Sequence, residues 1–425
     1  MNKAKRIDRI KNLVIALLLV SALCLLYQAV FYETASTASL SDGGETQSGS
    51  AASDTAALSA KPVYILVTGR DGTHTAAKYG REAREKLLGQ FSAPLGEALG
   101  SAGAPKQVST AEWQKALVGS GVYFDYLYPQ PLSLIASSLG TVPTGVPGDV
   151  LSRRLCLSVT GNAVSLYYLS TADGTVFRCS TALSAASLSA KLGDYQGGGA
   201  KFAFESGENY AALDPYFIFS GEDATLAAVS ASDPLTESGE LSRLFDAFGM
   251  SSRASAGYIE KGGSVVYVES EKSLRVNSGT GSVLFSVTGK NGVAVPHSSS
   301  LTTAEMISAC ADIAKRSVGS TAGVAELSLS SCVSNEAGET DISFVYSVGG
   351  TPVTLQSASP AASFKVSNGM VVRAELYFRR YSYTGETLGF LPETQAAAIA
   401  QADGGEPVLT YNDSGDGTTV SWIVQ

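Results

Sequence analysis

The sequence has few of the residues from which catalytic and metal sites are usually built. Its two histidines, His74 and His297, lie far apart, and neither has a motif around it. The zinc motif H-E-x-x-H, the serine motifs G-x-S-x-G and S-x-x-K, and the phosphate loop G-x-x-x-x-G-K-[ST] are all absent. These absences argue against the matching hydrolase and nucleotide-binding activities, and no catalytic residue, metal or cofactor is expected. We interpret both histidines as surface or turn residues.

A basic surface is also lacking. The 425 residues carry 30 Lys and Arg against 39 Asp and Glu, a formal net charge of −9. A short head before the first apolar run holds five basic residues and one acidic residue, so the rest of the chain carries a larger net negative charge. Nucleic-acid binding requires a basic footprint, and it is therefore excluded.

The acidic residues form no recognisable metal or hydrolase motif. The segment 412–417 resembles the start of a calcium loop, but its twelfth position is Ile423, where a bidentate Glu is needed. We interpret this segment as a hairpin turn between the last two strands. Acid pairs such as Glu205 with Glu208 have no partner motif, and we expect them to be solvated.

Cysteine is scarce, with five residues in the chain. Cys156, Cys179, Cys310 and Cys332 follow the apolar run and contain neither a C-x-x-C motif nor a His at metal spacing. If these residues lie outside the cytoplasm, disulfides are allowed there. Pairing of Cys156 with Cys179 and of Cys310 with Cys332 is locally plausible, but three connectivities exist and four buried free thiols are an equal alternative.

What the chain does have, near its start, is one long apolar run. Residues 13–32 contain no charged side chain and follow the basic head 1–12. About 20 apolar residues suffice to cross a bilayer, and the basic head places the N-terminus in the cytoplasm. We predict a single transmembrane helix with the bulk of the chain outside the cell. A cleaved signal peptide is the alternative, with Ala35 and Ala38 as small residues near a cleavage site.

Composition and pattern divide the rest of the chain. Residues 33–60 are small and polar and predict a flexible tether. Strands that arrive in hairpin runs, with helices between the runs, predict an α+β fold with mainly antiparallel sheets in two to three extracytoplasmic domains. The expected domains are an N-terminal α+β domain at 61–205, a middle α+β domain at 206–296 and a C-terminal α+β domain at 297–425.

Several local predictions can be compared with a structure. We expect a buried strand at 62–67, a helix at 76–88 and a strand at 371–381. Gly161-Asn162 and Asp173-Gly174 are typical hairpin turns. Thr302 or Thr303 is expected to cap a helix that runs to about Val318, with Glu305 in its first turn.

A series of short packing patterns without a catalytic motif follows residue 240. They are Leu241–Phe245, Gly257–Glu260, Tyr267-Val268, Leu274–Val276, Gly281, Leu284-Phe285, Phe344–Tyr346, Gly350–Val353, Val366–Gly369, Val371, Arg373–Leu376 and Ser421–Val424. With these patterns the chain resembles the YycH family over about residues 61–425, most clearly from residue 241 onward. The C-terminal part is also similar to the related YycI proteins, so the domain at 297–425 is expected to be YycI-like.

This resemblance implies a non-enzymatic regulator of a cell-envelope sensor histidine kinase of the WalK type in a Gram-positive bacterium. Its implied partners are that kinase and a YycI-like membrane protein. Ser21 and Ala22 would allow close helix contact within the membrane, although lipid anchoring alone explains the apolar run equally well. A surface adhesion or cell-wall-binding protein is the alternative function.

Overall fold

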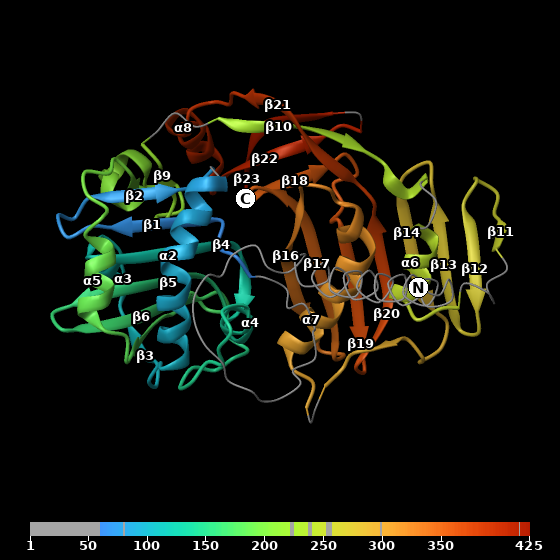
Figure 1. The fold of residues 1–425 in the computed structure, drawn as a ribbon, viewed down its shortest axis with the longest axis horizontal. Coiled ribbons are helices and arrows are strands. Elements are labelled where there is room, and N and C mark those ends of the chain that lie inside the picture. The colour runs from blue at the N-terminus through green and yellow to red at the C-terminus, as the bar shows by residue number, and fades with distance from the viewer. Residues whose placement is uncertain are drawn as a thin grey trace, which may run out of the picture. The chain divides into compact units, whose positions relative to one another are not determined.

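The computed structural model describes residues 60–79, 81–221, 225–236, 240–251, 257–297, 300–415 and 417–425. Within this part the chain is α+β, and its sheets are mainly antiparallel, as predicted. The described residues belong to one compact unit. The predicted head, membrane helix and tether lie outside the described residues, apart from Ala60 at the end of the tether. Figure 1 shows the order of the elements.

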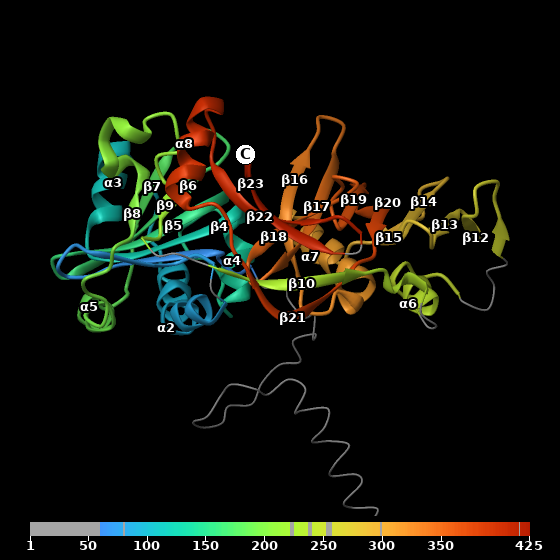
Figure 2. The same cartoon turned by 90° about the horizontal axis from the view of Figure 1, so that it is seen from above.

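The first sheet has seven strands in the order β2-β1-β4-β5-β6-β7-β3, and every neighbouring pair is antiparallel. Helices α2 and α5 cover one face, and α3 covers the other (Figure 2). The elements are β1 (Tyr64–Thr68), β2 (His74–Ala77), α2 (Arg81–Gly100), β3 (Lys106–Val108), α3 (Thr110–Val118), β4 (Gly121–Pro131), α4 (Leu132–Ser138), β5 (Leu151–Thr160), β6 (Ala163–Ser170), β7 (Val176–Ser180) and α5 (Ala185–Leu192).

In this region one local prediction is confirmed and another is partly wrong. The pairing of Thr160 with Ala163 confirms the two-residue turn at Gly161-Asn162, where Gly161 has a φ of 60°. The helix prediction at 76–88 placed the start too early, because residues 76 and 77 belong to β2 and pair with β1. The small residues at 75–77 are compatible with a helix or a strand, and pairing with the buried β1 makes this segment a strand.

A second, larger sheet has twelve strands. Its main order is β11-β12-β13-β14-β20-β19-β17-β18-β22-β23, with β15 on β20 and β16 on β17. Strands on both sides of residue 296 belong to this sheet, since β14 pairs with β20. The strands are β11 (Gly257–Ile259), β12 (Val265–Glu269), β13 (Lys272–Asn277), β14 (Ser282–Val287), β15 (Val293–Ala294), β16 (Glu326–Ser334), β17 (Glu339–Val348), β18 (Thr351–Leu355), β19 (Ala362–Ser367), β20 (Met370–Tyr377), β22 (Pro407–Asp413) and β23 (Thr418–Val424).

Helices α6 and α7 lie on one side of this sheet, and α8 packs against β22 and β23 on the other (Figure 2). The predicted cap is confirmed, because Thr302 accepts a hydrogen bond from the backbone N–H of Glu305 and α7 begins at Thr303. Phe248, which follows α6, stacks on Phe285 of β14 with ring centroids 4.3 Å apart. The helical elements are α6 (Glu240–Ala247), α7 (Thr303–Ala314), the π-helix η3 (Lys315–Gly319) and α8 (Glu393–Asp403).

Two short pairings complete the fold. β8 (Lys201–Phe202) pairs with β9 (Ile218–Phe219) around the 3-10 helix η1 (Ala203–Tyr210). β10 (Leu226–Ser232) pairs with β21 (Arg380–Leu388), and this ribbon runs along the top of Figure 1. The 3-10 helix η2 (Pro234–Thr236) follows β10.

A buried ion-pair network joins the first sheet to the end of the chain. The Arg153 guanidinium donates to Asp125 at 2.6 and 2.9 Å and to Glu406 at 2.6 and 2.8 Å. Its neighbour Arg154 donates to Asp214 at 2.9 Å. Burial acts to raise the pKa of Asp125, but the two arginines outweigh it and hold this pKa below its usual value. The network therefore stays charged away from water.

A second buried contact lies close to α8. The Lys78 ammonium donates to the Ile218 carbonyl at 2.6 Å and to Glu393 at 3.0 Å, and it lies 3.8 Å from the centre of the Phe217 ring. Ser220 donates to the other Glu393 oxygen from both its N–H and its hydroxyl. This contact ties the first turn of α8 to β2 and β9.

Arg153→Met should cost much of the stability of the fold. Asp125 and Glu406 would remain buried with only the longer contacts of Arg154, 3.4 Å to each, and breaking a buried pair costs about 3–5 kcal/mol. Urea denaturation measures the change in the free energy of unfolding. The matched control is Arg178→Met on β7, whose pair with Glu112 is about 40% exposed on both sides (42% and 37%) and should contribute less than about 1 kcal/mol. Equal effects of the two substitutions would contradict the structural role of the network.

Glu393→Gln should change how stability depends on pH. Burial acts to raise the pKa of Glu393, but Lys78 and the hydrogen bonds from Ser220 lower it below 4.5. A carboxyl with a lowered pKa stabilises the fold above its unfolded-state pKa, and this contribution disappears as the pH falls through the folded-state pKa. The substitution should therefore lower the free energy of unfolding at about pH 7 and have a smaller effect at about pH 3.

Denaturation at both pH values, with the exposed Glu97→Gln as control, separates this effect from general acid sensitivity. A Glu393→Gln effect that is the same at both pH values would show that the charge of Glu393 is not what stabilises the contact.

Candidate functional site

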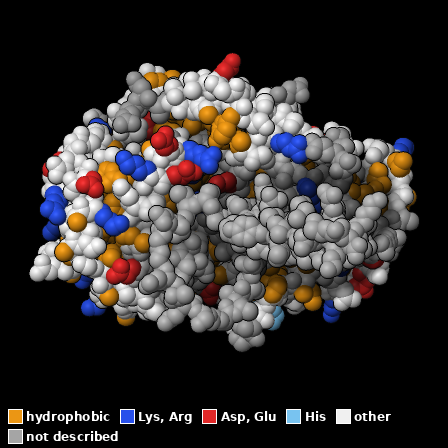
Figure 3. All heavy atoms as spheres, in the orientation of Figure 1, with side chains coloured by type: hydrophobic (Ala, Val, Ile, Leu, Met, Phe, Trp, Pro, Cys, Tyr) orange, Lys and Arg blue, Asp and Glu red, His pale blue; other side chains and the backbone are white. Residues whose placement is uncertain are grey.

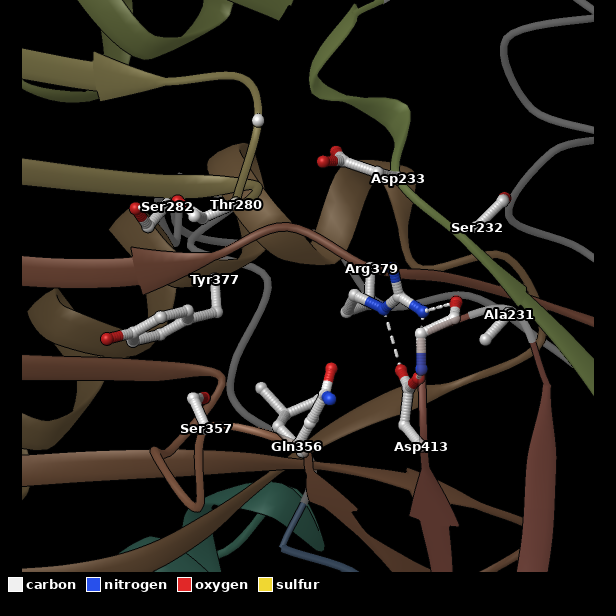
Figure 4. A pocket seen from close by; sticks show the side chains of 13 residues that line it. Ala231, Ser232, Asp233, Thr280, Ser282, Gln356, Ser357, Tyr377, Arg379 and Asp413 are labelled. Atoms are coloured by element: carbon white, nitrogen blue, oxygen red, sulfur yellow. Dashed lines mark hydrogen bonds and ion pairs between the residues drawn. The ribbon is translucent and has the colours of Figure 1, made fainter. Parts of the chain in front are cut away.

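A cavity with convergent polar groups lies where β10, β14, β18, β20 and β22 end or begin. Its volume is about 810 Å³. Figure 4 shows that its side chains come from segments far apart in the sequence. The lining residues are Ala231, Ser232, Asp233, Gly279, Thr280, Ser282, Leu355, Gln356, Ser357, Tyr377, Arg379, Asp413 and Gly415.

One wall is an ion pair between Arg379 and Asp413. Arg379 lies between β20 and β21, and Asp413 is the last residue of β22. The guanidinium donates to both carboxylate oxygens, at 2.6 and 2.7 Å, and also to the Gly415 carbonyl. Tyr381 donates to the same carboxylate at 2.8 Å. Burial acts to lower the pKa of Arg379, but its bonds to Asp413 outweigh this and raise it, so the guanidinium stays charged.

Asp233 forms the opposite wall. One of its carboxylate oxygens accepts a hydrogen bond from the Leu235 N–H at 2.8 Å, which fixes the side chain just after β10. The turn between β13 and β14 passes close by, because a Cβ on Gly281 would lie 2.9 Å from the other oxygen. Gly281 has a φ of 64°, and its carbonyl accepts from the Phe378 N–H at 2.7 Å. In Figure 4 the carboxylate faces the open centre.

The remaining walls carry uncharged polar groups. Thr280 and Ser282 share a hydrogen bond of 2.7 Å between their hydroxyls. Gln356 follows β18 and points into the cavity, and Tyr377 lies on the side away from Asp413 (Figure 4). The cavity therefore offers carboxylate, amide, hydroxyl and phenol groups within one space. Such a set binds a polar small molecule by hydrogen bonds.

No metal site is apparent among the described residues, because they include no group of three or more His, Cys, Asp and Glu side chains placed to hold an ion. Asp413 is occupied by Arg379 and Tyr381, so Asp233 is the carboxylate that faces the cavity with an oxygen to spare. On the part of the face in Figure 3 that is not covered by grey atoms, acidic and basic side chains are interspersed. This part of the surface shows no patch of one charge.

The four cysteines proposed as site residues from the sequence do not line this cavity. Ser21 and Ala22 are outside the described residues, and in the described part no helix has the length and apolar character needed to cross a membrane. The four cysteines at 156, 179, 310 and 332 are free, and burial raises the pKa of all four thiols, that of Cys179 and Cys332 to about 11. Their disulfides stay a prediction.

His74 is a correction to the sequence interpretation. It is 4% exposed, and its ring contacts the Thr68 hydroxyl at 2.9 Å through Nδ1 and Glu205 at 3.3 Å through Nε2. Glu205 is exposed, as expected, and also binds His74: burial acts to raise its pKa, but the bonds from His74 and the Phe202 N–H lower it. Thr68 on β1 and Glu205 on η1 supply hydrogen-bond partners for both ring nitrogens, so the imidazole can be buried. His297 is exposed, as expected.

Sequence reasoning missed the residues of the cavity. Residues 412–417 do connect β22 and β23 as a hairpin, as interpreted, but Asp413 also binds Arg379. The strand predicted at 371–381 is interrupted after Tyr377, and this break places Arg379 at the cavity. Consecutive Arg379 and Arg380, in a strand pattern that otherwise alternates apolar and charged residues, were a signal that could have marked the break.

Comparison with known proteins supports the fold. Neither the models of protein families nor the curated proteins match this sequence. Among solved structures, it is similar to the crystal structure of YycH from Bacillus subtilis, with a TM-score of 0.56 over 87% of this chain and 97% of that chain. The sequence identity is 12%. The fold is therefore YycH-like, and the resemblance seen in the sequence is confirmed at the level of fold.

Arg379→Met should loosen the wall of the cavity. Asp413 is 4% exposed and would lose its charge partner, which costs about 3–5 kcal/mol for a buried pair. Amide hydrogen exchange should become faster at Gly415, whose N–H donates to Asp413 at 2.8 Å. The control is Arg373→Met on β20, because the pair between Arg373 and Glu375 is exposed. Unchanged exchange at Gly415 would contradict the role of the pair.

Proposed function

We propose that this chain is a membrane-anchored extracytoplasmic regulator of a cell-envelope sensor histidine kinase, and that it is not an enzyme. The observation that carries the proposal is the YycH-like fold across 87% of the chain. The apolar run at 13–32 behind a basic head supports it independently, since it fits a single-pass anchor with its N-terminus in the cytoplasm. The resemblance implies a WalK-type kinase and a YycI-like membrane protein as partners.

The mechanism is a shift between signalling states of the kinase. The anchor helix packs beside the transmembrane helices of the kinase, with Ser21 and Ala22 allowing close approach. The outer part binds the sensor domain of the kinase. If it binds one signalling state more tightly than the other, the kinase equilibrium shifts by that difference in affinity.

Crosslinking of the full-length protein in the membrane of its native cell tests the partners. We expect a sensor kinase or a YycI-like protein to be recovered, and recovery should fall when the anchor or the outer part is removed. Recovery of wall polymer or unrelated surface proteins alone would favour the alternative, a surface adhesion or wall-binding protein. Retention on purified cell wall is the direct test of that alternative.

A narrower prediction concerns helix contact within the membrane. Ser21→Leu with Ala22→Leu should reduce crosslinking and change kinase output, because larger side chains hold helices apart. The control is Ala16→Leu, which adds the same bulk as Ala22→Leu on the opposite side of an ideal helix, about 170° from the middle of the Ser21–Ala22 pair. If both variants leave kinase output at the native level while crosslinking through the outer part persists, the anchor only holds the chain at the membrane.

A further inference from the structure

We propose that the cavity between Asp233 and Arg379 binds a neutral, hydroxyl-rich ligand, namely a saccharide of about two or three sugar units. Its volume of about 810 Å³ lies within the range of small-molecule sites, which is roughly 300–1,000 Å³. The inference rests on the chemistry of the cavity and does not require that the chain regulates a kinase.

Charge excludes the anionic ligands. Arg379 is the only cation among the described lining residues, and its Nε and Nη2 are used by Asp413 and Gly415, which leaves Nη1 alone for a ligand. Asp413 in turn is neutralised by Arg379. Asp233 therefore leaves the cavity with a net negative charge, which repels phosphates and uronic acids and admits neutral sugars.

Hydrogen-bonding capacity selects for hydroxyl groups. Four lining groups make no hydrogen bond to other described side chains or backbone: the second oxygen of Asp233, the Gln356 amide, the Tyr377 phenol and the Ser232 hydroxyl. The Gln356 amide presents two atoms in one plane and so matches a pair of neighbouring hydroxyls, and the second oxygen of Asp233 can accept a hydrogen bond from a further hydroxyl. The Tyr377 ring adds an apolar surface for the C–H groups of a sugar.

The walls are held in place before a ligand arrives. Asp233 is fixed by the Leu235 N–H, the 279–281 turn by the Phe378 N–H, and Asp413 by Arg379 and Tyr381. A preformed site loses little conformational entropy on binding. Such a site binds even a weakly attractive ligand to a measurable extent.

The test is calorimetric titration of the full-length chain in lipid nanodiscs prepared without sugar detergents. The probes are two neutral trisaccharides, triacetylchitotriose and maltotriose, and the anionic trigalacturonic acid. At least one neutral probe should bind with a dissociation constant of about 1 mM or tighter, and the anionic probe should bind at least about fivefold more weakly. Absence of binding by both neutral probes at about 20 mM, or tighter binding of the anionic probe, would overturn the proposal.

Two substitutions locate the binding. Asp233→Asn keeps an oxygen for the Leu235 N–H and removes the charge, and Gln356→Ala changes an exposed side chain, so at least the second variant leaves the fold intact. Each should weaken binding of the neutral probe by about fivefold or more. The controls are Asp149→Asn and Gln395→Ala, which alter exposed residues outside the cavity and should leave binding unchanged. Native affinity in both test variants would place any binding elsewhere and refute the site.

Discussion

Arg153 lies between two carboxylates that come from opposite ends of the chain, Asp125 on β4 and Glu406 before β22. Each of these groups is nearly buried, so each depends on the others to remain charged away from water. The first sheet therefore contains an arginine whose hydrogen bonds are complete only when the C-terminal strands are in place. Arg154 extends the same network to Asp214. The packing of the C-terminal strands against the first sheet follows from this requirement.

The same strand connects this network to the cavity. Glu406 precedes β22 and Asp413 ends it, so β22 has a buried arginine partner near each end, Arg153 and Arg379. Its middle is fixed by parallel pairing with β18 and antiparallel pairing with β23. A strand held at both ends and along both edges places the Arg379 wall of the cavity without help from loops. The cavity is thus a product of the large sheet, although its polar groups come from distant segments.

The sequence predicted those features that are decided by neighbouring residues. The turn at Gly161-Asn162, the cap at Thr302 and the α+β class depend on local chemistry and on the period of apolar residues, and the structure has all of them. The cavity could not be predicted in this way, because Asp233, Gln356 and Asp413 have no local relation. His74 was misjudged for the same reason, since Glu205 lies 131 positions away. The domain boundaries stay a prediction, although β14 and β20 share a sheet across residue 296.

The distance along the chain between Arg153 and Glu406, 253 residues, has a consequence for synthesis. A ribosome releases the first sheet long before it has made the strand that completes its charge network. Because contacts between distant residues form late, the N-terminal half cannot reach its final packing while the chain is still growing. Truncation near the C-terminus would therefore first disturb β5, which carries Arg153. The first sheet and the last strands therefore reach their final packing together. A protease or chaperone that detects unfolded last strands also detects an incomplete first sheet.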